Sequence, residues 1–509
     1  MKRTYKIFAL AIALLMMLGT LASCSAPNKG DDVDMNPGQW PNHNAPSGTP
    51  ILPEEDAGMP SEPENSFVEN PFIATGEQNV STFSADVDTA SYSYFRKLVM
   101  QNQPLDWLKQ NASSFRTEEF INYFKYEAWP PQNGSLFGVS ATIVDCPWNA
   151  NTVLMRLTLQ AEQAVEPTAN NLVFLIDVSG SMGANDKLPL LKNAFSNLVG
   201  QLTEDDVVSI VTYSGREAVV LEGCPGNQSE RIMAAINGLR ANGSTNGQAG
   251  MQKAYQIAER YMIEGGNNRI IMASDGDLNV GISSEEELTK FIEGKRDAGV
   301  YLSVLGFGTG NYKDSKMEAL ADNGNGVYYY IDGESEAERV LGGDLFSMLY
   351  TVAKDVKLQI TFDPQYISSY RLIGYENRIL SEEDYEDDTK DAGDVGAGHQ
   401  VTVCYELTLT EGAREASDPW MELGVRYKPQ GSDVSVPNVY KIGRECLKTS
   451  ADSDTAFIVC LIQTCMILHN SKYLGDMTIA GVLENLQALD LSAYPEREEF
   501  RELIEKLAA

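Results

Sequence analysis

Short apolar runs alternate with helical patterns through the middle of the chain. Five runs of strand length recur between residues 172 and 331. They cover residues 172–176, 207–212, 269–273, 301–305 and 327–331. Apolar residues at helical spacing fill residues 187–202, 229–239, 247–263, 284–295, 312–321 and 334–350. Near-continuous apolar strands alternating with helices predict an α/β fold, in which helices cover both faces of a doubly wound, mainly parallel sheet.

The pattern changes on both sides of this central domain, which we place at residues 166–352. After it, residues 356–362 alternate with a period of two, and residues 370–375, 400–408 and 421–427 resemble further strands. They predict an antiparallel β module over residues 353–448. Helical patterns at 453–468, 477–489 and 496–507 then predict C-terminal helices over residues 449–509.

A flanking region of helices and strands, residues 71–165, precedes the central domain. It holds a predicted strand at 81–87, a helix that Asp88 or Thr89 can cap, a second helix from Thr117, and strands at 137–144 and 153–159. Pairing partners are not visible in a sequence. It therefore stays open whether strands before and after the central domain form one β domain.

The N-terminus has the order of a secretory signal. Positive residues precede an apolar run at 7–18, and Leu21-Ala22-Ser23-Cys24 follows. The tetrapeptide resembles the lipobox of bacterial lipoproteins, which implies a signal peptide at residues 1–23 and a lipid on Cys24. Residues 24–70, rich in Pro, Asn, Gly and acidic residues, predict a flexible tether.

Charge and composition narrow the classes of function. The chain has 509 residues, enough for two or three domains. Its formal net charge of −33 repels nucleic acid, so nucleic-acid binding is not expected. The three histidines are scattered and the cysteines form no metal motif. Neither a zinc site nor histidine-based catalysis is expected.

Oxygen-bearing side chains follow two of the predicted strands and precede a helix. The first strand ends in an Asp-x-Ser-x-Ser motif, Asp177, Ser179 and Ser181. Thr245 lies in a glycine-flanked loop before a helix, and Asp275 follows another buried strand. In doubly wound sheets the carboxyl ends of the strands form the ligand-binding edge, so these loops should meet there.

Carboxylates and hydroxyls without His or Cys suit one hard divalent cation. Mg²⁺ is the expected ion, with Ca²⁺ and Mn²⁺ as alternatives.

Each residue also has a simpler interpretation. The hydroxyls can cap helices, and Asp275 before a glycine can form a turn. Asp277 and Asn279 could support the site from outside. The acidic loop at 382–394 could be a second calcium site, but a solvated loop is the simpler interpretation.

Asp177, Ser179, Ser181, Thr245 and Asp275 together resemble the metal-ion-dependent adhesion site (MIDAS) of von Willebrand factor type A (VWA) domains, over about residues 171–350. That family implies that these residues surround the ion, directly or through water. The whole chain also resembles bacterial VWA lipoproteins, on the flanking sequences at 82–92 and 371–378. Such proteins are often labelled homologues of calcium-activated chloride channels. No long apolar run after the signal supports that label here.

Three functions compete. The leading hypothesis is a non-enzymatic cell-envelope protein, lipid-anchored on the extracytoplasmic face of the membrane. Its metal would bind an acidic side chain of a protein partner. The runner-up is an envelope scaffold whose metal is structural. A metal-dependent hydrolase is third, because the sequence shows no paired general acid and base. The resemblance also implies that the last helix, 334–350, shifts on ligand binding and passes the shift to the β module.

Overall fold

The computed structural model describes residues 68–132, 134–163, 168–215, 217–243, 247–276, 285–308, 314–432 and 434–509. Within them, strands that precede and follow the central domain pair with each other in two antiparallel sheets. The first has the order β1 (Ile73–Ala74), β12 (Ile367–Ile373), β15 (Gln400–Leu409), β4 (Val153–Ala161), β3 (Phe137–Asp145). The second has the order β13 (Ile379–Leu380), β2 (Val80–Ser84), β11 (Thr351–Phe362), β16 (Met421–Pro429), β17 (Val436–Ile442), and β14 (Val395–Gly396) also pairs with β11.

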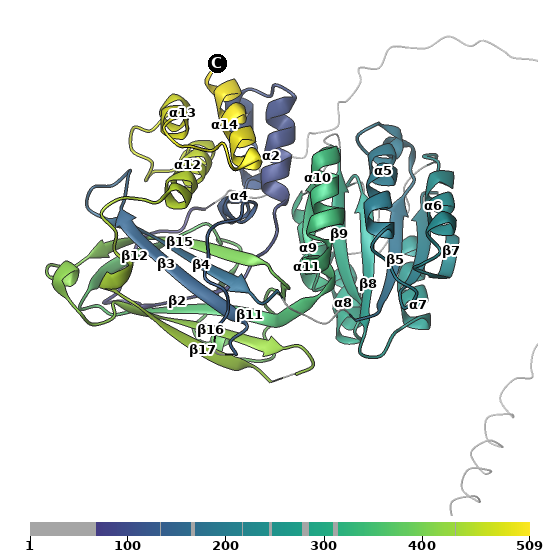
Figure 1. Cartoon of the computed structure of the whole chain (residues 1–509), viewed down its shortest axis with the longest axis horizontal. Coiled ribbons are helices and arrows are strands. Elements are labelled where there is room, and N and C mark those ends of the chain that lie inside the picture. The colour runs from purple at the N-terminus through teal and green to yellow at the C-terminus, as the bar shows by residue number, and fades with distance from the viewer. Residues whose placement is uncertain are drawn as a thin grey trace, which may run out of the picture. The chain divides into compact units, whose positions relative to one another are not determined.

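These two sheets enclose one apolar core. Side chains from strands on both sides of the central domain, among them Phe83, Leu157, Leu358 and Tyr405, are buried together in it. The central domain is therefore inserted into a β sandwich (Figure 1). This answers the question that the sequence left open. Burial of apolar area from both halves stabilises the sandwich only when both halves are present.

The central domain has the predicted α/β fold. Its sheet has the order β10 (Tyr328–Ile331), β9 (Tyr301–Phe307), β8 (Asn267–Ser274), β5 (Asn170–Asp177), β6 (Val207–Tyr213), β7 (Ala218–Pro225). All neighbours are parallel except β6 and β7. The apolar pattern of the sequence does not predict β7, because three of its residues face solvent and its apolar run is short. It does not predict β17 either, in which four residues are exposed.

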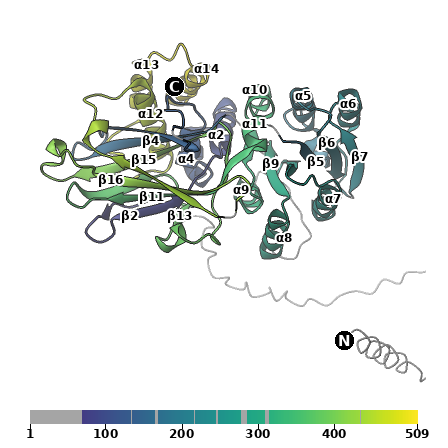
Figure 2. The ribbon, with the colours of Figure 1, turned by 60° about the horizontal axis from the view of Figure 1, so that its bottom comes forward.

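Helices cover both faces of this sheet (Figure 2). One face carries α5 (Leu188–Val199), α6 (Ser229–Gly238), α10 (Glu334–Glu338) and α11 (Leu345–Leu349). The other carries α7 (Gly247–Arg260), α8 (Glu285–Asp297) and α9 (Asp314–Asn323). Successive residues of β5, such as Phe174 and Leu175, pack against helices on opposite faces of the sheet. Both faces are buried, which explains why the strand is apolar along most of its length.

The helix predicted at 334–350 is present over Glu334–Leu349, but it is not a regular α-helix throughout. A π-helical turn at Arg339–Gly343 joins α10 to α11, and in it the Asp344 N–H donates to the Arg339 carbonyl at 2.7 Å. Gly342 and Gly343 have low helix propensity. Arg339 ion-pairs with both Glu336 and Asp344 across this turn.

A third group of helices packs on the outer face of the first sheet (Figure 1). It combines α2 (Ala90–Met100), α3 (Leu105–Gln110) and α4 (Thr117–Asn122) with α12 (Ser453–Leu468), α13 (Ile479–Gln487) and α14 (Pro495–Ala508). The predicted side-chain cap of α2 is wrong, because neither Asp88 nor Thr89 caps it. Instead Glu119 of α4 accepts a hydrogen bond from the Ser91 N–H at 2.7 Å.

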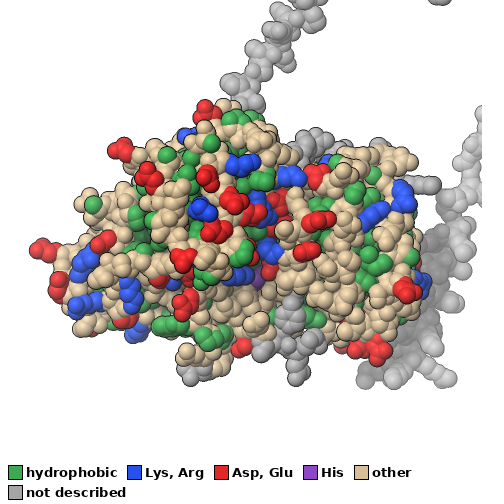
Figure 3. All heavy atoms as spheres, turned by 45° about the horizontal axis from the view of Figure 1, so that its top comes forward, with side chains coloured by type: hydrophobic (Ala, Val, Ile, Leu, Met, Phe, Trp, Pro, Cys, Tyr) green, Lys and Arg blue, Asp and Glu red, His purple; other side chains and the backbone are tan. Residues whose placement is uncertain are grey.

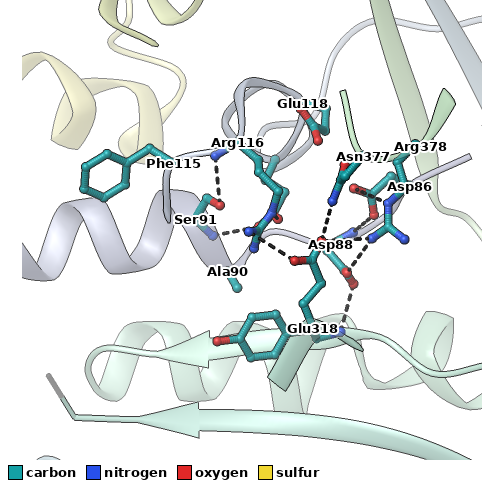
Figure 4. A network of polar contacts seen from close by, with 12 residues as sticks. Asp86, Asp88, Ala90, Ser91, Phe115, Arg116, Glu118, Glu318, Asn377 and Arg378 are labelled. Atoms are coloured by element: carbon teal, nitrogen blue, oxygen red, sulfur yellow. Dashed lines mark hydrogen bonds and ion pairs between the residues drawn. The ribbon is translucent and has the colours of Figure 1, made fainter. Parts of the chain in front are cut away.

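Buried charges join the central domain to its surroundings. Arg378, after β12, ion-pairs with Asp322 and Glu318 of α9 at 2.7 and 3.3 Å. It also ion-pairs with Asp88 at 3.4 Å and Asp86 at 3.5 Å (Figure 4). Burial raises the pKa of Asp88 and of Asp322, while Arg378 lowers both. One guanidinium therefore compensates carboxylates from two separate segments.

A second network lies beside it. Arg96 of α2 ion-pairs with Asp332 after β10, with Glu336 of α10 and with Glu499 of α14, at 2.6, 2.8 and 2.9 Å. Charged side chains of both signs lie close together in the middle of the face shown in Figure 3. Both networks tie α2 and the β sandwich to the central domain, which fixes its placement.

We predict that Arg378→Met destabilises the protein by about 3–5 kcal/mol at pH 8, because it leaves buried carboxylates without their cation. Without Arg378, the pKa values of Asp88 and Asp322 in the folded protein should rise further above their ordinary value of 3.8. A raised folded pKa favours folding at low pH, so the cost should shrink between pH 8 and pH 5. Urea unfolding at both pH values measures this. Arg414→Met, which removes an exposed pair with Asp145, is the control and should cost under about 1 kcal/mol.

Candidate metal centre

The first loop of the predicted site begins where β5 ends. Asp177 is its last residue and is fully buried. The Ser179 N–H donates to Asp177 Oδ1 at 2.7 Å, and the Ser179 and Ser181 hydroxyl oxygens lie 2.9 Å apart. Ser179 is buried and Ser181 is exposed. Three of the five predicted oxygen-bearing residues therefore lie in one turn that reaches from the sheet to the surface.

Asp275 follows β8, the strand next to β5 in the sheet. It is only 2% exposed, and Gly276, at a φ of +89°, forms the turn after it. Ser274 closes the turn by accepting from the Gly276 N–H at 3.2 Å. The turn interpretation of Asp275 is thus correct, and the turn holds the carboxylate beside the first loop.

Tyr213 is a further buried residue at this edge of the sheet. It ends β6 and is paired in register with Asp177. Burial raises the pKa of its hydroxyl, and the charges of Asp177 and then Asp275 raise it further. Both carboxylates therefore act on one buried hydroxyl. The sequence analysis missed Tyr213, because a tyrosine at the end of an apolar strand looks like any other core residue.

A third loop is hydrogen-bonded to the first. The Asn242 N–H donates to the Val178 carbonyl at 2.7 Å, and the Gly180 N–H donates to the Gly243 carbonyl at 3.0 Å. Gly243 has a φ of +87°, and a Cβ there would lie 2.5 Å from Ser214 Oγ. This loop leads to Thr245, which lies outside the described residues, as do Asp277 and Asn279.

Lys187 is a second residue at this edge that sequence reasoning missed. Its Nζ donates to Asp275 Oδ2 at 2.8 Å. The neighbouring Asp186 ion-pairs with Lys97 of α2 at 3.0 Å, so the segment between the first loop and α5 is held from two sides. The available signal was a lysine at the first residue of a predicted helix, where the helix dipole disfavours a cation.

The donors present fit a hard divalent cation. Two carboxylates and two hydroxyls are oxygen ligands of the kind that Mg²⁺ prefers. Ser179 makes no side-chain cap to the short helical turn that follows it, which removes its simpler interpretation. Among the described residues, no three His, Cys, Asp or Glu side chains are grouped so that they could hold a metal. A site here thus depends on hydroxyls as well as carboxylates.

Comparison with known proteins identifies the domains. Residues 171–341 match the family model of the von Willebrand factor type A domain, and residues 60–156 match a model named von Willebrand factor. Residues 347–509 match the model described as "Uncharacterized protein YfbK, C-terminal". The chain thus carries a VWA domain followed by a YfbK-type C-terminal domain, which confirms the VWA domain predicted from the sequence.

Individual proteins match parts of the chain. YfbK of Escherichia coli (strain K12) is 42% identical over 353 residues, covering 67% of this chain and 60% of that protein. Human inter-alpha-trypsin inhibitor heavy chain H3 is 27% identical over 188 residues, covering 35% of this chain and 21% of that protein. The chain therefore spans less than two thirds of either relative. A solved von Willebrand factor type A structure from Catenulispora acidiphila aligns with a TM-score of 0.42 at 15% identity, covering 76% of this chain and 89% of that one.

The VWA family assignment supports a protein-interaction role. VWA domains commonly bind a divalent metal at a MIDAS site. Cys24, the expected signal and most of the expected tether lie outside the described residues. In the part of the chain that is described, every helix is too short or too polar to cross a bilayer.

We predict that Gly243→Ala destabilises the protein more than Gly265→Ala does. Both glycines have positive φ, but a Cβ at Gly265 meets nothing within 4 Å. Gly265→Ala should cost about 1 kcal/mol through backbone strain alone. Gly243→Ala should cost about 1–2 kcal/mol more, because its methyl group collides with Ser214. Equal costs in urea unfolding would show that the loop has room to adjust.

Proposed function

Because the chain joins a VWA domain to a YfbK-type C-terminal domain, we propose that it is a cell-envelope protein that binds a protein partner through a divalent cation. Asp177, Ser179, Ser181, Thr245 and Asp275 are the proposed ligands, directly or through water. The proposal includes anchoring of the protein to the extracytoplasmic face of the membrane by a lipid on Cys24. That part rests on the lipobox sequence.

One observation carries the proposal: oxygen donors from separate strands share one edge of the sheet. Asp177 ends β5, and Asp275 directly follows β8, the parallel strand paired with β5. Ser179 and Ser181 are within hydrogen-bond distance of each other in the adjoining turn. Both carboxylates are buried at this edge, where the Lys187 ammonium compensates part of their charge.

The residues leave room for an outside ligand. A cation held by two carboxylates and a few hydroxyls keeps coordination positions that water or a partner's oxygen can fill. When bound, the ion supplies a hard Lewis acid that favours a carboxylate from the partner. The exposure of Ser181 marks the side from which the partner would approach.

The test compares Asp177→Ala with Asp205→Ala. Asp205 is exposed and precedes β6, at the opposite edge of the same sheet. Asp177→Ala should weaken Mn²⁺ binding at least about a hundredfold, because even residues that only support a metal ligand change affinity by about 10–100-fold. The Asp205→Ala variant should bind Mn²⁺ with the affinity of the unaltered protein. Titration of free Mn²⁺, followed by electron paramagnetic resonance, measures both.

Partner binding is tested with the same two variants. Capture of envelope proteins in Mg²⁺ should fail in chelator and fail with Asp177→Ala, while Asp205→Ala retains it. Thermal unfolding then separates this function from the scaffold alternative. A partner-binding site should lose its ligand in chelator with little change in Tm, whereas a structural metal should lower Tm strongly. Retention of the partner by Asp177→Ala contradicts the proposal.

A further inference from the structure

Lys187 places a positive charge against one of the two carboxylates of the site. Its Nζ lies 2.8 Å from Asp275 Oδ2, and the two side chains are 13% and 2% exposed. An ion pair this sheltered from water is screened weakly, so its strength exceeds that of a surface pair. A cation that uses Asp275 must therefore share this carboxylate with an ammonium group.

The surrounding backbone leaves space for the lysine. Gly308 follows β9 at a φ of +70°, and a Cβ there would lie 2.2 Å from Lys187 Cε. The Gly308 carbonyl accepts a hydrogen bond from the Tyr330 hydroxyl at 3.1 Å, which holds this backbone in place. The side chain of Lys187 thus runs through a gap that only a glycine leaves open.

The position is unfavourable for a lysine by local rules. Lys187 is the N-cap residue of α5 and makes no side-chain cap, although Ser, Thr, Asp or Asn would cap there. Its charge also lies at the positive end of the helix dipole. The pair with Asp275 is what compensates these costs. A residue that breaks local rules and is held by the site has a role at the site.

We propose that Lys187 is an internal competitor for the metal ion, which lowers the affinity of the site for a divalent cation. Asp177 and Asp275 alone carry a formal charge of minus two, and Lys187 reduces it to minus one. A divalent ion bound there leaves one positive charge, which only an anionic ligand neutralises. Lys187 therefore weakens binding of the bare ion and favours its capture together with a partner's carboxylate. This inference rests on the proposed function.

The experiment replaces the charge and keeps the bulk. Lys187→Met has nearly the same length and no charge, and Lys187→Gln still offers Asp275 a hydrogen-bond donor. Lys192→Met is the matched control, since Lys192 lies on the same helix and bonds the carbonyls of Asn237 and Leu239 instead. Mn²⁺ alone is the probe, titrated against the full chain at constant pH and ionic strength.

Both Lys187 variants should bind Mn²⁺ about tenfold tighter or more, because removal of a like charge a few ångströms away raises affinity by at least that factor. Lys192→Met should match the unaltered protein. Lys187→Arg, which keeps the charge, should not gain affinity. Circular dichroism confirms that each variant is folded, and Lys187→Gln replaces Lys187→Met if the latter is not.

The outcomes separate the two proposals. Unchanged or weaker Mn²⁺ binding by both neutral variants overturns the role of Lys187 and leaves the metal site intact. If Mn²⁺ binds to the neutral Lys187 variants but not to the unaltered protein, the role of Lys187 is supported, and the unaltered site needs an additional anion to hold the ion. Absence of Mn²⁺ binding in every variant overturns the proposed function and this inference together.

Discussion

Backbone hydrogen bonding between segments far apart in the sequence is the constraint on which this structure depends. β2 pairs with β11, and β4 pairs with β15, so strands on either side of the VWA domain complete the same two sheets. The VWA domain leaves and re-enters one rigid sandwich. Its two ends are therefore held near each other, and a change in its shape strains the strands on both sides.

Buried charge adds a second constraint on the same junction. Arg378 and Arg96 each bind carboxylates from two or three separate segments. α9, which carries Glu318 and Asp322, follows β9 on the side of the sheet opposite α5. α2 contacts both Asp332, at the end of β10, and Asp186, beside the first loop of the site. The candidate metal edge is thus connected to the β sandwich and the C-terminal helices through ion pairs as well as through the chain.

These contacts change how movement at the site would be transmitted. The last helix of the VWA domain, from α10 to α11, contains a π-helical turn and leads into β11. Lys97 and Arg96 of α2 also connect two points at the carboxyl edge of the VWA sheet to α14. A helix that belongs to the flanking region is therefore part of the surroundings of the VWA site.

The sequence by itself predicted most strands and helices of the VWA domain and five candidate ligands, but not β7, Tyr213 or Lys187. Buried parallel strands are apolar throughout, which predicted β5 and β8, and the oxygen-bearing residues directly after them predicted the edge. Only the tertiary structure decided which strands pair across the insertion, what caps α2, and that Lys187 faces Asp275. Periodicity reports which face of an element is buried. It does not report which distant segment covers that face, or which charged groups pair, because those contacts form between residues about 30 to 300 positions apart.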